Sequence, residues 1–275
     1  MVELIQGLKD EYEVIPIPEV GRGGYSVVGL VRSKSTGIIF AHKIPALQFD
    51  GVRDTRGIVH EASVLELIAS NGGNPNIIAL HDRDKDCSSL ILPYYPQRSL
   101  RDYLKAGYRL TVTGAIVMVI GICDALSYLK QLGIVHCDIK PGNILLDYEQ
   151  PLDPVVFDFN IALVNENEQQ CFVGTPYYMA PEMMLARGID HRTDIYSLGA
   201  TLYHMLTGEA PFTGKDASYN HVHTPPKNPR EINPAIPEAL AQTVLKCLEK
   251  KPEDRYQTAL GIKENLEKVL IRLAA

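Results

Sequence analysis

The chain has 275 residues, a formal net charge of −6 at pH 7, and 45% hydrophobic against 22% charged residues. This balance is typical of a folded globular protein and excludes an intrinsically disordered one. Because proteins that bind nucleic acid usually present a basic face, the acidic net charge disfavours that class of function.

The sequence contains no clear membrane span, signal peptide or disulfide pattern. Its longest apolar run, residues 115–123, is about half of the roughly 20 residues that a spanning helix needs. The chain opens with Met1, Val2 and Glu3, without the basic start and apolar core of a signal peptide. Its five cysteines are scattered, with no CxxC pair and no histidine at zinc-ligand spacing. We therefore expect a reduced, cytoplasmic protein.

The first third of the chain reads as β-structure interrupted by one helix. Between residues 12 and 92, short β-rich runs such as 27–32 and 38–44 are separated by turn residues. Residues 54–70 instead carry apolar side chains at helical spacing and end at Asn71, Gly72 and Gly73. The pattern predicts an antiparallel sheet with one helix.

After Pro96 the periodicity becomes helical. Apolar residues recur at helical spacing over residues 100–105, 111–131, 194–207, 237–250 and 258–273. The Pro-rich residues 224–237 are expected to form a surface loop between two of these helices. A boundary between a β-rich part and a mainly helical part is therefore predicted near residues 93–97.

A glycine-rich segment lies where a hairpin turn is expected. Gly21, Gly23 and Gly24 precede the apolar run that begins at Val27. Glycines allow a backbone to approach phosphate oxygens and to present N–H groups to them. Such patterns often arise by chance, so this segment taken alone favours an ordinary glycine-rich hairpin.

Two charged residues in the same region could form a buried pair. Lys43 lies in a strand that is expected to be half-buried, where a lysine needs a partner. Glu61, on the inward side of the predicted helix, is the natural carboxylate, because a buried cation is tolerated mainly when it is paired. The alternative is that both are solvated surface charges.

The strongest signal is a cluster of polar residues at the ends of short apolar strands. Asp138, Lys140 and Asn143 precede the apolar residues 144–146, and Asp158 follows the apolar residues 155–157. Carboxylate and amide oxygens suit Mg²⁺, and a carboxylate can also accept a proton. Turn formation alone would explain one Asp or Asn but not the whole set.

The glycine-rich segment, Lys43, Glu61, the cluster 138–143 and Asp158 follow one another along the chain. Three later segments continue the series: 174–182, 194–199 and 251–255. This ordered set of motifs resembles a eukaryotic-type (Hanks-type) protein kinase catalytic domain, in the form of the Ser/Thr kinases also found in bacteria. The resemblance extends from about residue 12 to residue 270. It implies an α+β, bilobal fold, with a small antiparallel β-sheet lobe carrying one helix and a larger, mainly α lobe. The whole chain, 1–275, would be one kinase domain, with lobes at 1–92 and 98–275 and a hinge at 93–97.

The resemblance implies that ATP and Mg²⁺, with Mn²⁺ as an alternative, are required. Lys43 would contact the α- and β-phosphates and be held by Glu61, while Asn143 and Asp158 would bind the metal. Asp138 would accept or orient the hydroxyl of a protein substrate.

Further residues match by the same resemblance. Lys140 would offset charge on the transferred γ-phosphoryl group. Together with Thr175, it is typical of kinases that act on Ser and Thr. Glu182 and Arg255 would form a structural ion pair, and Asp194 would anchor the backbone of the loop that carries Asp138.

The adenine pocket can be located in the same way. Leu92 falls at the gatekeeper position, and Pro93 and Tyr95 would offer a backbone C=O and N–H to the adenine edge. Val28, Ala41 and Leu145 would sandwich the ring, although each would serve equally well as a core residue. The loop carrying Gly21, Gly23, Gly24 and Ser26 would cover the phosphates.

Two positions depart from the family pattern. Cys137 occupies a position where many members have an arginine that binds a phosphorylated activation segment, and residues 161–173 contain no Ser, Thr or Tyr. Activity is therefore expected not to depend on phosphorylation of that segment. Asn160 stands where the family has glycine, and since asparagine tolerates positive φ we expect it to keep the same backbone conformation.

Two other functions remain open. A pseudokinase would bind nucleotide and act through protein contacts, but Lys43, Glu61, Asp138, Asn143 and Asp158 are all intact. A small-molecule phosphotransferase would share the nucleotide machinery, but it would have no evident use for the peptide-docking segment 174–182. We therefore expect protein substrates, no nucleic acid and no membrane span, and the sequence does not indicate an oligomeric state.

Overall fold

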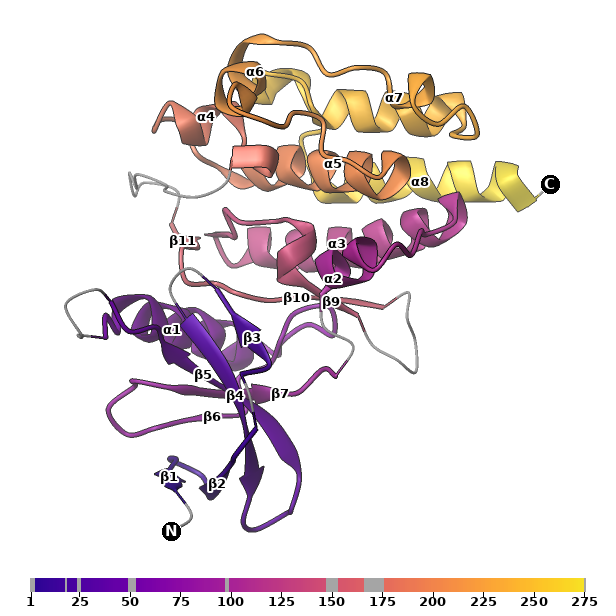
Figure 1. Ribbon diagram of the computed structural model, residues 1–275. Coiled ribbons are helices and arrows are strands. Elements are labelled where there is room, and N and C mark those ends of the chain that lie inside the picture. Colours follow the sequence, from indigo (N-terminus) through magenta and orange to yellow (C-terminus); the bar gives the residue numbers. More distant parts are fainter. Residues whose placement is uncertain are drawn as a thin grey trace. The chain divides into compact units, whose positions relative to one another are not determined.

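The computed structural model of the chain comprises two compact units (Figure 1). One unit contains Met1–Pro96 and Asp158–Ile161, and the other contains Gln97–Phe157 and Ala162–Ala275. The motif that begins at Asp158 therefore belongs to the β-rich unit, although it is far from the rest of that unit in sequence. The structure describes residues 3–17, 19–23, 26–48, 53–96, 99–146, 153–165 and 176–274.

In the described part of the first unit, seven strands form an antiparallel sheet. The strand order is β1-β2-β4-β5-β7-β6, and β3 pairs with β4 beside this path. The strands predicted from runs 27–32 and 38–44 are confirmed as β4 and β5. The bounds are β1 Leu4–Gln6, β2 Glu11–Ile15, β3 Gly21–Arg22, β4 Ser26–Ser33, β5 Ile39–Pro45, β6 Asp82–Arg83 and β7 Leu90–Pro93.

The strand register assigns side chains to the two faces of this sheet. Directly paired residues share a face, as do residues two apart on one strand. Val28 pairs with Lys43, and Leu30 pairs with Ala41, which in turn pairs with Leu92. These five residues therefore share one face. The opposite face carries a buried hydrophobic cluster of Tyr12, Val31, Phe40 and Ile91.

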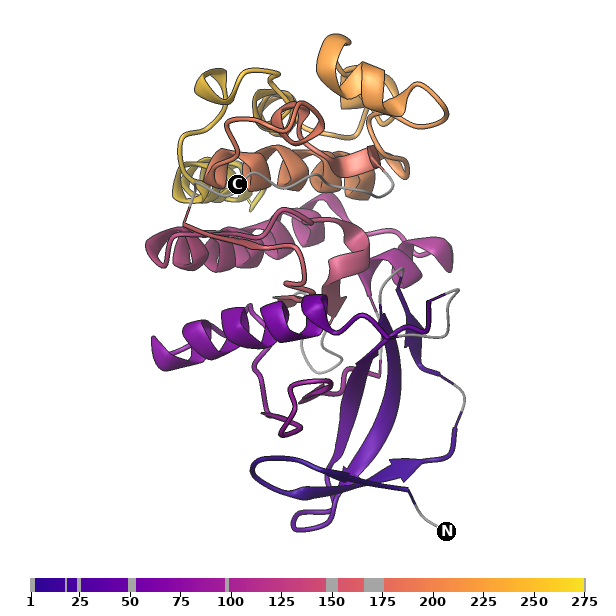
Figure 2. The same cartoon turned by 90° about the vertical axis from the view of Figure 1, so that its left-hand side faces the viewer.

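The predicted helix of the first unit is confirmed as α1, Arg56–Ser70, and Figure 2 shows it beside the sheet. Its buried side chains recur at helical spacing and include Ile58, Glu61 and Leu65. The helix ends just before Gly72, whose φ of 98° is one that glycine adopts readily. The helix thus directs Glu61 toward the interior of its unit.

The second unit is mainly helical, as predicted. Its described helices are α2 Leu100–Lys105, α3 Val112–Gln131, α4 Pro181–Met184, α5 His191–Thr207, α6 Ala217–His223, α7 Glu238–Cys247 and α8 Ala259–Ala274. Single 3₁₀ turns occur at η1 Pro141–Asn143, η2 Pro176–Tyr178, η3 Pro229–Glu231 and η4 Pro252–Asp254. Two small antiparallel pairs join β8 Ile134–Val135 to β11 Leu163–Val164, and β9 Ile144–Leu146 to β10 Pro154–Val156.

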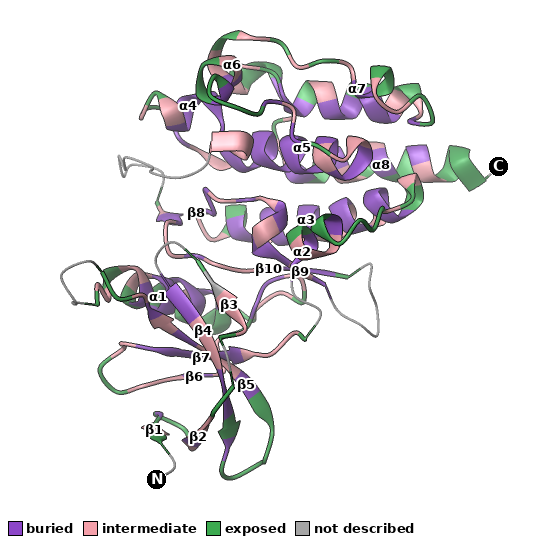
Figure 3. Cartoon of the chain, viewed as in Figure 1, coloured by how far each residue is buried: buried purple, intermediate pink, exposed green. Residues whose placement is uncertain are grey.

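Helix α3 packs against both α5 and α8, and α5 is buried along nearly its whole length (Figure 3). Helix α5 begins three residues earlier than predicted, because Asp190 accepts a hydrogen bond from the backbone N–H of Arg192 and caps the helix. It ends at Gly208, whose φ is 91°. The short helices α4 and α6 were not predicted. Helix α4 has four residues, about one turn, and α6 (ASYNHVH) lacks the i, i+3, i+4 spacing of apolar residues that α2 shows.

Helix α3 is the one helix in the described residues that is long and apolar enough to cross a membrane by length and composition. Of its apolar window, 56% is buried inside the structure, and the helix packs against α5 and α8. Its apolar character is therefore that of a core helix.

Candidate active-site residues

The glycine-rich segment is a hairpin. Gly21 in β3 pairs with Val28 in β4, and the N–H of Gly23 donates to the carbonyl of Ser26 at 2.8 Å. Gly23 is exposed, whereas Ser26 is buried. Gly24, which was predicted to belong to the same site, lies outside the described residues. The described part of the hairpin thus presents an open backbone at Gly23.

Lys43 connects two carboxylates in the first unit. Its Nζ lies 2.5 Å from Glu61 Oε2 and 2.6 Å from Asp158 Oδ1. The Lys43 side chain is only 4% exposed and that of Glu61 is fully buried, so the predicted ion pair is confirmed and neither residue is a surface charge. Burial lowers the pKa of Lys43, but the carboxylates of Asp158 and Glu61 outweigh it and raise that pKa overall. Lys43 is therefore a fixed positive charge.

The segment that begins at Asp158 is bound to the same cluster. Asp158 has a φ of 73°, in the left-handed region, and its carboxylate contacts Lys43. The next residue, Phe159, is fully buried, and its N–H donates to Glu61 Oε1 at 3.3 Å. Glu61 therefore holds both Lys43 and the backbone that follows Asp158.

Asn160 does not use the positive φ that asparagine tolerates. Asn160 is not among the residues with positive φ, because Asp158, two residues earlier, makes the left-handed turn of this segment. The Asn160 side chain instead donates from Nδ2 to Asp158 Oδ1 at 2.9 Å. A glycine could not form this bond. Sequence reasoning missed it because it depends on the backbone of Asp158.

The residues predicted to contact adenine in the first unit belong to strands β4, β5 and β7 or follow β7. Val28 and Ala41 are only partly buried on the sheet face that carries Lys43, and Leu92 on the same face is 4% exposed. Pro93 pairs with Phe40 at the end of β7, and Tyr95 follows that strand. Partly exposed apolar side chains beside Lys43 could contact a flat, apolar ring.

Asp138, Lys140 and Asn143 form one hydrogen-bonded group in the second unit. Asp138 Oδ2 accepts from Lys140 Nζ and from Asn143 Nδ2, both at 2.7 Å. Asn143 Nδ2 also donates to the carbonyl of Asp138 at 2.9 Å. Because the amide nitrogen faces Asp138, the amide oxygen of Asn143 points elsewhere, which suits a metal ligand. Leu145, in β9 just beyond Asn143, pairs with Val155 and is partly buried.

Asp194 holds the backbone that leads to Asp138. Its carboxylate accepts the N–H of His136 at 2.7 Å and that of Cys137 at 2.9 Å, which confirms the predicted anchor. Burial raises the pKa of Asp194 to about 7, against the opposing effect of these two donors. His136 Nδ1 accepts the N–H of Asp138 at 3.2 Å, so its Nε2 carries the proton and donates to the carbonyl of Phe157 at 3.1 Å.

Cys137 offers no charge at the position of the missing arginine. It is 3% exposed and has a φ of 65°, which is uncommon for a residue other than glycine. Burial raises the pKa of its thiol well above the ordinary value, so the side chain is neutral at physiological pH. A buried neutral thiol cannot bind a phosphate as an arginine would.

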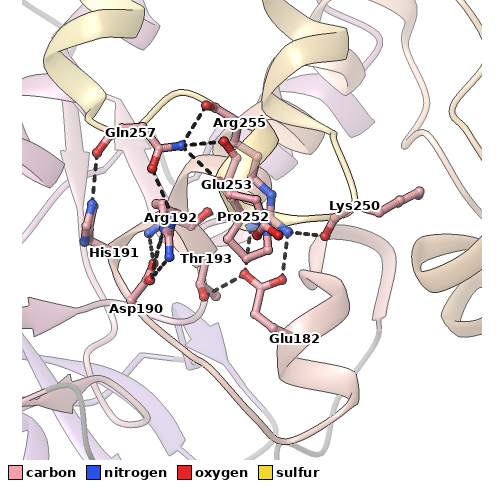
Figure 4. Close-up of polar contacts among 10 residues, drawn as sticks. All are labelled: Glu182, Asp190, His191, Arg192, Thr193, Lys250, Pro252, Glu253, Arg255 and Gln257. Carbon is pink, nitrogen blue, oxygen red and sulfur yellow. Dashed lines mark hydrogen bonds and ion pairs between the residues drawn. The ribbon is translucent and has the colours of Figure 1, made fainter.

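The ion pair predicted between Glu182 and Arg255 is confirmed (Figure 4). Arg255 Nη1 and Nη2 each donate to one oxygen of the Glu182 carboxylate at 2.7 Å. The remaining donors reach the carbonyls of Arg192, Glu249 and Lys250 at 2.8 to 2.9 Å, so all five guanidinium N–H groups have partners. Thr193, which sequence reasoning missed, donates to Glu182 at 2.9 Å.

Lys250 lies close to this ion pair and was not predicted. Its Nζ donates to the carbonyl of Asn220 at 3.2 Å and lies 4.5 Å from the centre of the Phe212 ring. Burial, with a smaller contribution from the nearby charge of Arg255, lowers the pKa of Lys250 to about 8. Its protonated form is therefore less favourable in the folded chain than in the unfolded one.

Replacing this lysine is expected to change how stability depends on pH. The cost of protonated Lys250 is fully present at pH 7 and fades as the pH rises from about 8 toward the ordinary value of 10.5. The stability of Lys250→Met relative to wild type should therefore fall over that range. Urea unfolding of both proteins at pH 7 and pH 10 measures this difference in stability. Lys227→Met is the control, because the Lys227 side chain is exposed. A relative stability that stays constant or rises contradicts the expected pKa.

The segment 174–182 is described only from Pro176 onward. Thr175 and Gly174 lie outside the described residues. Tyr178 in η2 contacts His204 Nδ1 at 2.7 Å, and Glu182 in α4 is held by Arg255, so the described part of the segment is bound to the helical unit through side chains.

Comparison with known proteins agrees with this arrangement. The family model described as protein kinase domain matches residues 15–268. The chain is 32% identical over 271 residues to the probable serine/threonine-protein kinase CPE1738 of Clostridium perfringens, covering 95% of this chain and 38% of that protein. It is 32% identical over 277 residues to the serine/threonine-protein kinase PknB of Mycobacterium tuberculosis, covering 95% of this chain and 43% of that protein.

A third relative is the serine/threonine-protein kinase Pkn1 of Myxococcus xanthus, which is 35% identical over 268 residues and is matched over 92% of this chain and 38% of its own length. The chain thus spans about two fifths of the length of these curated relatives. The predicted resemblance and the predicted α+β fold are both confirmed. The chain belongs to the protein kinase domain family, and these bacterial relatives are named serine/threonine-protein kinases.

Proposed function

We propose that this chain transfers the γ-phosphoryl group of ATP to Ser and Thr hydroxyls of protein substrates. The observation that carries the proposal is the position of Lys43, whose buried ammonium group contacts Glu61 at 2.5 Å and Asp158 at 2.6 Å. A buried lysine held by two carboxylates contributes little net stability because all three groups lose hydration, so its presence favours a functional role such as binding a negatively charged ligand. ATP phosphates are the ligand that the family membership favours.

The remaining nucleotide contacts are assigned to the sheet face that carries Lys43. Val28, Ala41 and Leu92 are assigned to the adenine ring, and Leu145 of the second unit is assigned to the same ring. Pro93 and Tyr95 would offer backbone groups to the adenine edge. The loop residues Gly21, Gly23, Gly24 and Ser26 would cover the phosphates.

The residues present fit a divalent cation, which the family uses together with ATP. Asp158 supplies a carboxylate and Asn143 an amide oxygen, and hard cations such as Mg²⁺ or Mn²⁺ prefer these oxygen ligands. Two protein ligands are enough where substrate phosphates supply others, as Mg²⁺ sites commonly do. The bound cation would offset negative charge on the phosphates. We assign Mg²⁺ as the physiological metal.

Asp138 is assigned to the transferring step. Its carboxylate would accept the proton of the substrate hydroxyl, whose oxygen forms a bond to the γ-phosphorus while the bond to the leaving ADP oxygen breaks. Lys140, 2.7 Å from Asp138 Oδ2, carries a positive charge beside the carboxylate and would offset charge on the γ-phosphoryl group. The hydrogen bond from Asn143 keeps Asp138 in one orientation.

We assign a reducing, cytoplasmic environment to this domain. The described cysteines Cys87, Cys123, Cys137 and Cys247 are all free thiols. Free thiols persist where cellular reductants maintain them.

The experiment that tests the function is transfer of labelled γ-phosphate from Mg-ATP to the protein itself and to a generic basic protein. Phosphoamino-acid analysis identifies the acceptor, and Asp138→Asn is the control variant. Phosphoserine or phosphothreonine that disappears in the control supports the proposal. Binding of Mg-ATP without transfer to any protein would overturn it in favour of a pseudokinase.

Phosphatase treatment is expected to leave the transfer rate unchanged within about a factor of two, because the buried thiol of Cys137 provides no cation for a phosphate to pair with. Residues 161–173 also contain no hydroxyl side chain. The rate is measured before and after treatment, with the removal of phosphate verified by mass spectrometry. A large loss of activity that returns on incubation with Mg-ATP would contradict this expectation.

A further inference from the structure

We propose that Asn160 is a positioning residue that fixes the carboxylate of Asp158 for the divalent cation. The inference rests on the proposed function, in which Asp158 is a metal ligand. It concerns a side chain that the corresponding glycine of the family lacks. Asn160 contacts neither nucleotide nor substrate in this proposal, and it acts through Asp158 alone.

The hydrogen bonds converge on one oxygen. Asn160 Nδ2 donates to Asp158 Oδ1 at 2.9 Å, and Lys43 Nζ donates to the same oxygen at 2.6 Å. Two donors on one carboxylate oxygen restrict rotation of the carboxylate about its side-chain bond. The charged acceptor also makes each bond stronger than one between neutral groups. The orientation of Asp158 is therefore set by two neighbours rather than by Lys43 alone.

The bond from Asn160 also closes the backbone turn. Asp158 has a φ of 73°, in the left-handed region that residues with a side chain enter at some cost, smaller for aspartate than for most. A hydrogen bond from the side chain two residues later offsets part of that cost. Phe159, between them, is held by its N–H bond to Glu61 and by complete burial. All three residues of the segment are thus held in this conformation.

The first turn of helix α1 lies beside Asn160. A Cβ built on Gly57, in the first turn of α1, would lie 3.6 Å from Asn160 Cβ, which is ordinary van der Waals contact. Asn160 therefore lies against the start of the helix that carries Glu61. Asn160 and Lys43 contact Asp158 directly, and helix α1 supports both through Gly57 and Glu61.

The test compares Asn160→Ala and Asn160→Gly with wild type. The primary measurement is the Mg²⁺ concentration that half-saturates binding of a non-hydrolysable ATP analogue, determined by calorimetry. Loss of one hydrogen bond to a charged group is expected to raise that concentration about fivefold to tenfold in both variants. Amide hydrogen exchange over residues 158–161 without nucleotide should also become faster. Asn71→Ala removes a side-chain amide that bonds to the carbonyl of Leu67 at the end of α1, and it is the matched control.

The outcomes separate the inference from the proposed function. If wild type binds the analogue equally well with and without Mg²⁺, or if Asp158→Ala leaves the Mg²⁺ response intact, the metal-ligand assignment fails. If wild type responds to Mg²⁺ and both Asn160 variants respond at the same concentration as Asn71→Ala, only the inference is overturned. A lower Mg²⁺ requirement in the Asn160 variants would overturn it as well, since the amide would then compete with the cation.

Discussion

Replacing Asp138 with asparagine is expected to reduce the rate of phosphoryl transfer about a thousandfold, the size of effect typical of a removed general base. The substitution keeps the shape of the side chain and an oxygen that Lys140 Nζ, now 2.7 Å away, can still approach. It removes the negative charge and the ability to accept the proton of the substrate hydroxyl. Nucleotide binding should change little, because the charge that holds the phosphates is assigned to Lys43.

The measurement combines steady-state transfer to a basic protein with calorimetric binding of the ATP analogue. Asp216→Asn is the matched control, because Asp216 is exposed, lies in the same unit and makes no side-chain cap bond at the start of α6. A decrease of less than about tenfold in Asp138→Asn would show that this carboxylate is not the base. A parallel loss of analogue binding would instead indicate damage to the site.

Local sequence patterns predicted the elements that are stabilised along their own length. Helix α3 and the helix α1 were predicted within two residues, because their apolar positions repeat over several turns and face a core. Strand β1, Leu4–Gln6, was not predicted. It has only three residues, in the order Leu, Ile, Gln, so its sequence shows no alternation of apolar and polar residues.

The position of β1 depends on a residue far along the chain. Asp82, which is 2% exposed, accepts the N–H groups of Leu8, Lys9 and Asp10 at 3.0 to 3.3 Å and the hydroxyl of Tyr12 at 2.9 Å. These bonds hold the turn that brings β1 beside β2. No pattern within residues 4–15 contains that information, so a reading of local periodicity could not find it.

In the candidate site, too, some contacts could be predicted from the sequence and others could not. The pairs Lys43 with Glu61 and Glu182 with Arg255 could be predicted because a buried charge requires a partner and the family resemblance identified it. The hydrogen bond from Asn160 to Asp158 could not, since it arises from the left-handed φ of Asp158, which no residue type at that position requires. The functional roles of these residues remain predictions, whereas their contacts are observed.

Arg255→Ala is expected to lower the free energy of unfolding by about 3 to 5 kcal/mol, the cost typical of removing one partner of a buried ion pair. The Arg255 side chain is fully buried, and its loss leaves the carboxylate of Glu182, only 8% exposed, without its cation. It also removes the donors to the carbonyls of Arg192, Glu249 and Lys250. Urea unfolding followed by far-UV circular dichroism measures the effect, because this unit is mainly helical and the chain has no Trp.

A double-mutant cycle distinguishes the ion pair from simple loss of packing. Glu182→Ala removes the carboxylate, so adding Arg255→Ala to it should cost less than Arg255→Ala costs alone, with a coupling energy of about 1 to 3 kcal/mol. The exposed pair Lys227 and Glu231, 3.8 Å apart with both side chains 58% exposed, is the control. Lys227→Ala should change stability by less than about 0.5 kcal/mol. If Arg255→Ala does not fold, Arg255→Lys, which has three donors in place of five, replaces it in the cycle. Additive costs within experimental error would mean that the buried pair contributes no more than the control pair, and that the cost of Arg255→Ala comes from the other contacts of Arg255.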